Sequence, residues 1–127
     1  MKTILVDAVN CFVIKGEGIY QPLYELLETY PNKKILLTGA NDEQLDTFGL
    51  HNMPYELFTL KHNPEKADPK YYETLLSRYD LEASDVLYFE HAPTAVKSAE
   101  SVGILTHFYD FDKKDLTALK EFLDKNL

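Results

Sequence analysis

The chain has 127 residues and a formal net charge of −8, and 45% of its residues are hydrophobic. This length and composition are typical of one globular domain, which we expect to span residues 1–127. The acidic balance argues against a nucleic acid as partner, because binding a phosphate backbone requires clustered Lys and Arg, whereas a phosphorylated small molecule needs only local positive charge.

Short apolar runs alternate with amphipathic segments along the whole chain. The runs read as buried strands, and the amphipathic segments have the apolar spacing of helices. In chain order, the sequence predicts a strand over 3–6, a helix over 22–30, a strand over 34–38, a helix from an N-cap at Asn41 to near Gly49, a strand over 56–60, a helix from Asp68-Pro69 through Tyr79, a strand over 86–90, a helix from Pro93 to Gly103, a strand over 104–108 and a last helix capped by Asp112.

Continuous apolar strands separated by helices predict a parallel sheet that is covered on both faces. The fold class is therefore α/β. We expect a three-layer α/β/α sandwich with a mostly parallel, Rossmann-like sheet of about five strands. The order of the strands in the sheet cannot be read from the sequence.

Cys11 is the single cysteine, so no internal disulfide can form and a reducing, cytoplasmic setting is expected. Asp7 and Asn10 interrupt the N-terminal apolar run before it could form the apolar region of a secretory signal. No stretch approaches the ~20 apolar residues of a membrane helix, so we expect no membrane partner.

Polar side chains follow the carboxyl ends of the predicted strands, which is where an open α/β sheet binds its ligands. Asp7 follows the first strand and Thr38 the second. Lys66 follows the third after a short loop, and Glu90 and His91 follow the fourth. Two carboxylates attract a hard cation such as Mg²⁺, while a lysine and a hydroxyl can hold a phosphoryl group whose phosphorus an aspartate attacks.

The order of these residues resembles the haloacid dehalogenase (HAD) superfamily of aspartate-nucleophile phosphatases and their relatives. ILVD is similar to the strand that carries the family nucleophile, on Asp7, and LLTGAN is similar to the second motif, on Thr38. Lys66 matches the motif lysine, and Glu90 matches the first acid of the fourth motif. The resemblance is strongest over residues 66–104 and covers nearly the whole chain in the right order.

This resemblance implies an HAD-like hydrolase, a Mg²⁺-dependent phosphohydrolase that works through an aspartyl-phosphate on Asp7. Thr38 and Lys66 would hold the phosphoryl oxygens. Mg²⁺ would lie between Asp7, the backbone carbonyl of Val9 and Glu90. The substrate would be a phosphorylated small molecule or a phosphoprotein.

Two positions depart from the family pattern. Family phosphatases carry a second aspartate two residues after the nucleophile, as general acid and then base, and Val9 can serve as neither. We therefore expect weak turnover, or turnover of activated substrates such as acyl and aryl phosphates only. The fourth motif usually holds two aspartates but reads Glu90-His91 here. Glutamate can still ligate a metal, and His91, with an ordinary pKa near ~6.5, could transfer protons.

The intervals from Asp7 to Thr38 and from Thr38 to Lys66 are the places where family cap domains are inserted. Each interval here has room for one helix and its loops, so no cap domain is expected. An uncapped site in this superfamily implies a bulky or macromolecular substrate, or a lid supplied by another subunit of a homo-oligomer.

Simpler interpretations of the same residues stay open. Asp7 could cap its strand, Lys61 or Lys70 could be the residue that acts in place of Lys66, and Glu90 could serve the dipole of the following helix. Two other functions also fit part of the pattern. One is a catalytically inactive HAD-like domain that acts as a binding or interaction module, which Val9 and His91 favour. The other is a phosphorylation-responsive receiver domain. A receiver, however, places an acidic pair after its first strand and its phosphorylated aspartate after its third, which this chain does not.

Overall fold

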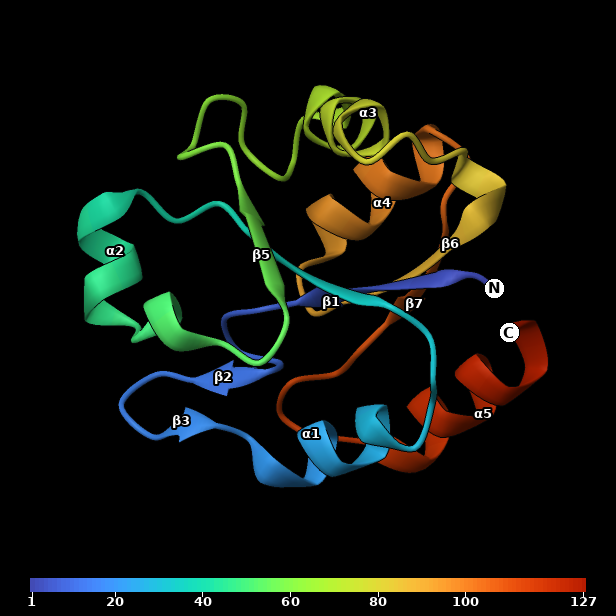
Figure 1. Cartoon of the computed structure of the whole chain (residues 1–127), viewed down its shortest axis with the longest axis horizontal. Helices are drawn as coiled ribbons and strands as arrows, with labels where there is room; N and C mark the ends of the chain where they lie inside the picture. The colour runs from blue at the N-terminus through green and yellow to red at the C-terminus, as the bar shows by residue number, and fades with distance from the viewer.

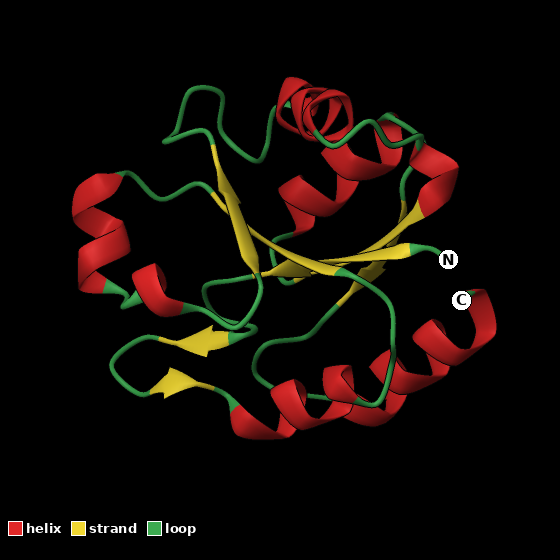
Figure 2. Cartoon of the chain, in the orientation of Figure 1, coloured by secondary structure: helices red, strands yellow, loops and turns green.

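The computed structural model describes all residues 1–127. A parallel sheet of five strands in the order β5-β4-β1-β6-β7 forms its centre, and helices cover both faces (Figures 1 and 2). The elements are β1 (Thr3–Asp7), β2 (Val13–Ile14), β3 (Gly18–Ile19), α1 (Gln21–Glu28), β4 (Lys34–Thr38), α2 (Asp42–Thr47), the 3-10 helix η1 (Leu50–Asn52), β5 (Glu56–Thr59), α3 (Pro69–Arg78), the 3-10 helix η2 (Ala83–Asp85), β6 (Val86–Glu90), α4 (Pro93–Ser101), β7 (Leu105–Phe108) and α5 (Leu116–Asn126).

Alternate residues of the central strands enter two separate cores, because successive side chains of a strand point to opposite faces. Ile4 and Val6 of β1 pack in the core beneath α1, α2 and α5, whereas Leu5 packs in the core beneath α3 and α4. Figure 1 shows α3 and α4 above the sheet, α1 and α5 below it, and α2 at its left. The predicted three-layer α/β/α sandwich with a five-stranded parallel sheet is confirmed.

Most helix boundaries follow the predicted capping residues. Asn41 caps α2 in a reciprocal capping box with Gln44, and Asp68 accepts a hydrogen bond from the Lys70 N–H at the start of α3. The predicted cap at Asp112 is wrong, since α5 begins at Leu116 and is capped by Asp115. Lys114 lies between them with φ +47°, a left-handed backbone that prevents a helix from running through from Asp112.

The chain order of the strands places β1 and β6 side by side at the middle of the sheet. From β1 the chain proceeds outward to β4 and β5, and it then returns to β6 and proceeds outward to β7. Ligands bind at such a switch in strand order, beyond the carboxyl ends. The short antiparallel pair β2–β3, which we did not predict from the sequence, follows β1 at this edge. No helix of the structure has the length and apolar character needed to cross a membrane.

Candidate active site

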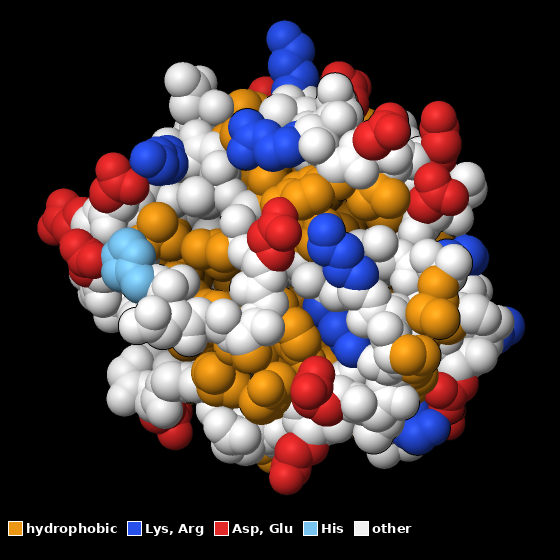
Figure 3. Space-filling model, viewed as in Figure 1, with side chains coloured by type: hydrophobic (Ala, Val, Ile, Leu, Met, Phe, Trp, Pro, Cys, Tyr) orange, Lys and Arg blue, Asp and Glu red, His pale blue; other side chains and the backbone are white.

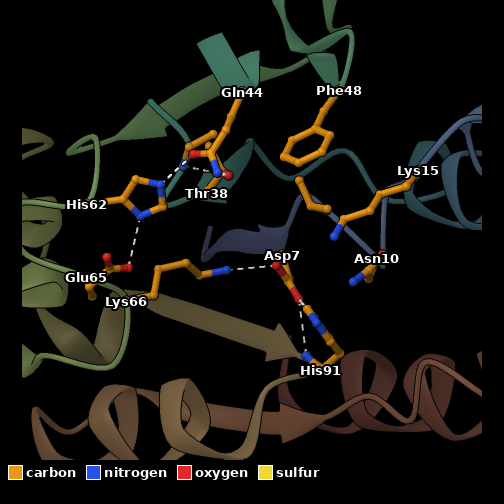
Figure 4. A pocket seen from close by; sticks show the side chains of 13 residues that line it. Asp7, Asn10, Lys15, Thr38, Gln44, Phe48, His62, Glu65, Lys66 and His91 are labelled. Atoms are coloured by element: carbon orange, nitrogen blue, oxygen red, sulfur yellow. Dashed lines mark hydrogen bonds and ion pairs between the residues drawn. The ribbon is translucent and has the colours of Figure 1, made fainter. Parts of the chain in front are cut away.

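A pocket of about 260 Å³ opens at the carboxyl edge of the sheet. Figure 4 shows that its walls come from segments far apart in the sequence, which surround Asp7 at the end of β1. Its polar lining comes from the end of β1 and the loop after it, the turn after β2, the end of β4, the start of α2, the loop before α3 and the residue after β6. It comprises Asp7, Asn10, Lys15, Thr38, Gln44, His62, Glu65, Lys66 and His91.

Lys66 joins the two carboxylates of the site. Its Nζ lies 2.8 Å from Oδ1 of Asp7 and 2.6 Å from Oε1 of Glu90. All three side chains are shielded from solvent, with 16% of the Lys66 side chain exposed and 2% or less of the other two. The alternative lysine Lys61 instead forms an exposed ion pair with Asp42, at 3.0 Å. The geometry therefore favours Lys66 over Lys61 as the lysine of the site.

His91 contacts the opposite oxygen of Asp7. Its backbone N–H donates to Asp7 Oδ2 at 3.2 Å, and its ring Nδ1 is paired with the same oxygen. The Cys11 thiol also donates to Oδ2, at 3.2 Å. Nδ1 of His91 lies 3.2 Å from Oε2 of Glu90 as well. Asp7 Oδ2 therefore receives three donors, whereas Oδ1 receives only the Lys66 amine.

The buried groups shift one another's pKa values in opposite directions. Hydrogen bonds to Asp7 and Glu90 raise the pKa of His91 to about 9, so its ring is a cation at neutral pH. Burial disfavours the charged form of Glu90, yet Lys66 and His91 hold the pKa of Glu90 well below its usual range. Burial dominates at Asp7 and raises its pKa despite the neighbouring Lys66. Burial and the adjacent carboxylates also raise the pKa of the Cys11 thiol, which stays protonated.

Thr38 ends β4 on the other side of the pocket from His91 (Figure 4). Its Oγ1 accepts the backbone N–H of Ala40 at 3.2 Å. Its carbonyl oxygen accepts the hydroxyl proton of the buried Tyr71 at 2.7 Å, which fixes the end of the strand to α3. The Thr38 hydroxyl is thus held at the pocket wall and keeps its own proton available for a ligand.

Four of the five predicted site residues, Asp7, Val9, Thr38 and Lys66, line this pocket. Glu90 does not line it, because it is fully buried behind Lys66 and His91. Sequence analysis gave His91 a proton-transfer role but did not predict its contact with Asp7, and it missed three further polar residues of the pocket wall. They are Asn10 in the loop after β1, Lys15 in the turn after β2 and Gln44 near the start of α2, and the signal for them was the position of these segments at the same edge of the sheet.

The predicted magnesium ligand set does not form in this arrangement. Oε1 of Glu90 accepts from Tyr88 and Lys66, and its Oε2 accepts the Ala92 N–H at 3.0 Å and faces His91. Both oxygens of Glu90 are therefore satisfied by the protein. The oxygen of Asp7 that faces Glu90 across His91 is also saturated with donors. A cation held jointly by these two carboxylates would have to displace His91, so these residues do not fit the metal as they stand.

Comparison with known proteins gives structural neighbours but no sequence match. No family model and no curated protein matches the chain. D,D-heptose 1,7-bisphosphate phosphatase from B. bronchiseptica, solved with magnesium and phosphate, has a TM-score of 0.73 at 16% identity over 100% of both chains. An alanine mutant of an HAD family enzyme from Bacteroides thetaiotaomicron, also with magnesium and inorganic phosphate, has a TM-score of 0.73 at 11% identity over 94% of this chain and 98% of that one.

A third neighbour, an uncharacterized protein from Corynebacterium glutamicum, has a TM-score of 0.59 at 14% identity and covers 96% of this chain and 95% of its own. At such low identities, these likenesses show the fold alone. The chain has the HAD-like fold, as the sequence motifs predicted, and no cap domain is inserted between its strands. The named neighbours with magnesium and phosphate are phosphatases or HAD family enzymes.

Proposed function

We propose that the chain is an HAD-like phosphohydrolase that forms an aspartyl-phosphate on Asp7. The observation that carries this proposal is that Asp7, Thr38 and Lys66 line one pocket at the carboxyl edge of the sheet. Within it, the Lys66 amine donates a hydrogen bond to Oδ1 of Asp7 at 2.8 Å. A nucleophile, a hydroxyl donor and a cation are the groups that phosphoryl transfer needs in one place.

The attacking atom is Oδ1 of Asp7. Oδ1 accepts one hydrogen bond, from Lys66, and so keeps a lone pair, whereas Oδ2 is saturated by His91 and Cys11. When Oδ1 bonds to phosphorus, the bond from phosphorus to the leaving oxygen breaks. Lys66 and the Thr38 hydroxyl bind the phosphoryl oxygens and offset the charge that develops on them. Water then attacks the phosphorus, the bond between Oδ1 and phosphorus breaks, and the protons of the water leave with the released phosphate, so that Asp7 returns as a carboxylate.

Val9 limits the substrates to those with a good leaving group. Nothing at residue 9 can protonate a departing alkoxide, so the leaving group has to depart as a stable anion. An acyl phosphate leaves as a carboxylate and an aryl phosphate as a phenolate, and neither needs a proton. We therefore propose an activated phosphorylated small molecule, or an acyl-phosphorylated protein, as substrate.

The surface charge supports this choice over a nucleic acid. On the face shown in Figure 3, Lys and Arg side chains are scattered among Asp and Glu and form no continuous basic surface. The positive groups of the site itself are local, namely Lys15, Lys66 and His91 around one pocket. Local charge of this kind suits a single phosphoryl group.

Hydrolysis of acetyl phosphate and p-nitrophenyl phosphate tests the proposal. We expect slow turnover by the wild-type protein and its loss, by at least 10²-fold, in Asp7→Asn, because the amide is not a nucleophile. Asp42→Asn is the matched control, since Asp42 is an exposed carboxylate paired with Lys61 outside the pocket. Equal rates in wild type and Asp7→Asn would refute the proposal.

A non-catalytic binding module is the second candidate function. The specific observation in its favour is that Asp7 is only 1% exposed and already holds ion pairs with Lys66 and His91. This function predicts no turnover of either substrate, together with a bound partner that Asp7→Asn retains. The hydrolysis assay and a pull-down with both proteins therefore separate the two candidates.

A further inference from the structure

The charges of the side chains around Asp7 balance one another. Two carboxylates, Asp7 and Glu90, face two basic side chains, Lys66 and His91, and each base contacts both carboxylates. No buried side-chain oxygen or nitrogen of these four residues lacks a partner. A site built around a metal would leave carboxylate oxygens that need the cation to be satisfied.

We propose that His91 occupies the place of a divalent cation beside Asp7, so that this site binds a phosphoryl group without a metal ion. The inference rests on the proposed function, because it concerns the phosphoryl group that Asp7 and Lys66 would receive. Its ligand is a phosphate oxyanion, and its cations are the two side chains that the chain itself supplies.

Two features of the geometry disfavour a hard cation shared by Asp7 Oδ2 and Glu90. Oδ2 of Asp7 has three donors, and an oxygen with two lone pairs has no further direction in which to ligate a cation. The ring of His91 also separates Asp7 from Glu90, since its Nδ1 contacts one oxygen of each. Both bases are held by buried partners, so a metal would have to break several ion pairs at once.

The backbone makes the position of His91 a fixed one. Its own N–H donates to Asp7 at 3.2 Å, and the next N–H, that of Ala92, donates to Glu90 at 3.0 Å. Pro93 then begins α4. The turn between β6 and α4 therefore aims the ring at Asp7, and an aspartate at residue 91 would present its carboxylate to the same place.

Calorimetric titration of the wild-type protein with inorganic phosphate, in EDTA and in about 10 mM Mg²⁺, tests the proposal. Such a concentration saturates ordinary Mg²⁺ sites. We expect the two dissociation constants to agree within about twofold, and Mg²⁺ alone to leave the melting temperature unchanged. Phosphate binding that is tenfold tighter with Mg²⁺ would overturn the inference and leave the proposed function standing. Absence of phosphate binding in both buffers would refute both.

The variant His91→Asp provides the complementary test. It places a third carboxylate against Asp7 and Glu90, so we expect Mg²⁺ to raise its melting temperature and to tighten phosphate binding at least tenfold. His91→Asn is the matched control, with the same shape and no charge, and it should not respond. A folded His91→Asp protein without a Mg²⁺ response would overturn the inference. Should His91→Asp not fold, the wild-type titrations still decide.

A softer metal is the remaining occupant that the experiment must detect. Ligand atoms of Asp7, Cys11 and His91 all lie within 4.8 Å of one another. Addition of Co²⁺ reports such a site through the absorption band of a thiolate-bound ion. We expect no such band, and its appearance in wild type with loss in Cys11→Ser would show that a metal, rather than the histidine, is the cation of the site.

Discussion

At the scale of single residues, the strand face on which a side chain lies decides whether that side chain reaches the pocket. Asp7, Thr38 and Lys66 could be predicted because each follows a strand end, and strand ends of a parallel sheet meet at one edge. Glu90 was expected in the pocket, yet it lies on the same strand face as Tyr88, two residues earlier. The Tyr88 hydroxyl donates a hydrogen bond to the Glu90 carboxylate. Tyr88 belongs to the core under α3 and α4, so Glu90 points into that buried layer.

Replacement of Val9 by an acid tests whether the missing proton donor limits the rate. Val9→Asp restores a carboxyl group two residues after the nucleophile, at the pocket wall where Val9 lies. We expect hydrolysis of an alkyl phosphate to rise by roughly 10²–10⁴-fold, because its alkoxide needs a proton, and that of p-nitrophenyl phosphate to rise less, because it gains only from the base that activates water in the second step. Steady-state rates on both substrates measure this.

Val9→Asn is the control for Val9→Asp, since asparagine has the shape of aspartate but cannot act as a general acid or base. Equal gains in the two variants would mean that polarity alone, and not acid catalysis, changed the rate. No gain in either would show that the leaving group does not pass residue 9.

At the scale of elements, the predicted caps at Asn41 and Asp68 are confirmed, because each side chain accepts a backbone N–H in the first turn of its helix. The segment before the last helix contains two aspartates, Asp112 and Asp115, and we predicted only Asp112 as the cap. The choice between them depends on the backbone of Lys114, whose positive φ is not encoded by its side chain. The hairpin β2–β3 was missed because two-residue strands show too little alternation to be recognised.

The Asp115 cap of α5 should contribute to the free energy of unfolding. The Asp115 carboxylate accepts the N–H of Ala118, and its loss leaves that donor without a partner at the start of a helix that packs Leu119 and Leu123 into the core. We expect Asp115→Ala to lower the free energy of unfolding by about 1 kcal/mol in urea denaturation. Asp112→Ala, which removes an exposed carboxylate outside the helix, should change it by less than about 0.5 kcal/mol.

At the scale of the whole molecule, the strand order could not be predicted. All five strands are short and parallel, and although the more polar strands β5 and β7 are the edge strands, no side chain specifies which strand lies beside which. That order nevertheless creates the site. It makes β1 and β6 adjacent, so the segment after β6 can close over Asp7 from the strand beside it. The loop before α3 supplies Lys66 from above the same edge. One ion-pair network therefore ties three parts of the chain together.

This network should give the protein a stability that depends on pH in the alkaline range. The folded pKa of His91 is raised to about 9, above the ordinary value of 6.5, by its hydrogen bonds to Asp7 and Glu90. The folded state therefore holds the proton more tightly than the unfolded state, and the stabilisation is fully present below pH 6.5 and is lost as pH rises through about 9. The buried Cys11 thiol does not titrate in this window, because its pKa is raised well above 9.0.

Urea denaturation of wild type and His91→Gln at pH 6.5, the ordinary pKa of histidine, and at pH 9.5, above the raised pKa of about 9, measures the effect. We expect the wild-type free energy of unfolding to fall between the two pH values by clearly more than that of the variant. The difference of the two differences isolates His91, because every other titrating group is shared by both proteins. A wild-type protein whose pH dependence equals that of His91→Gln would show that the ring is not a cation in the folded state, and the carboxylates of Asp7 and Glu90 would then have only Lys66 to balance them.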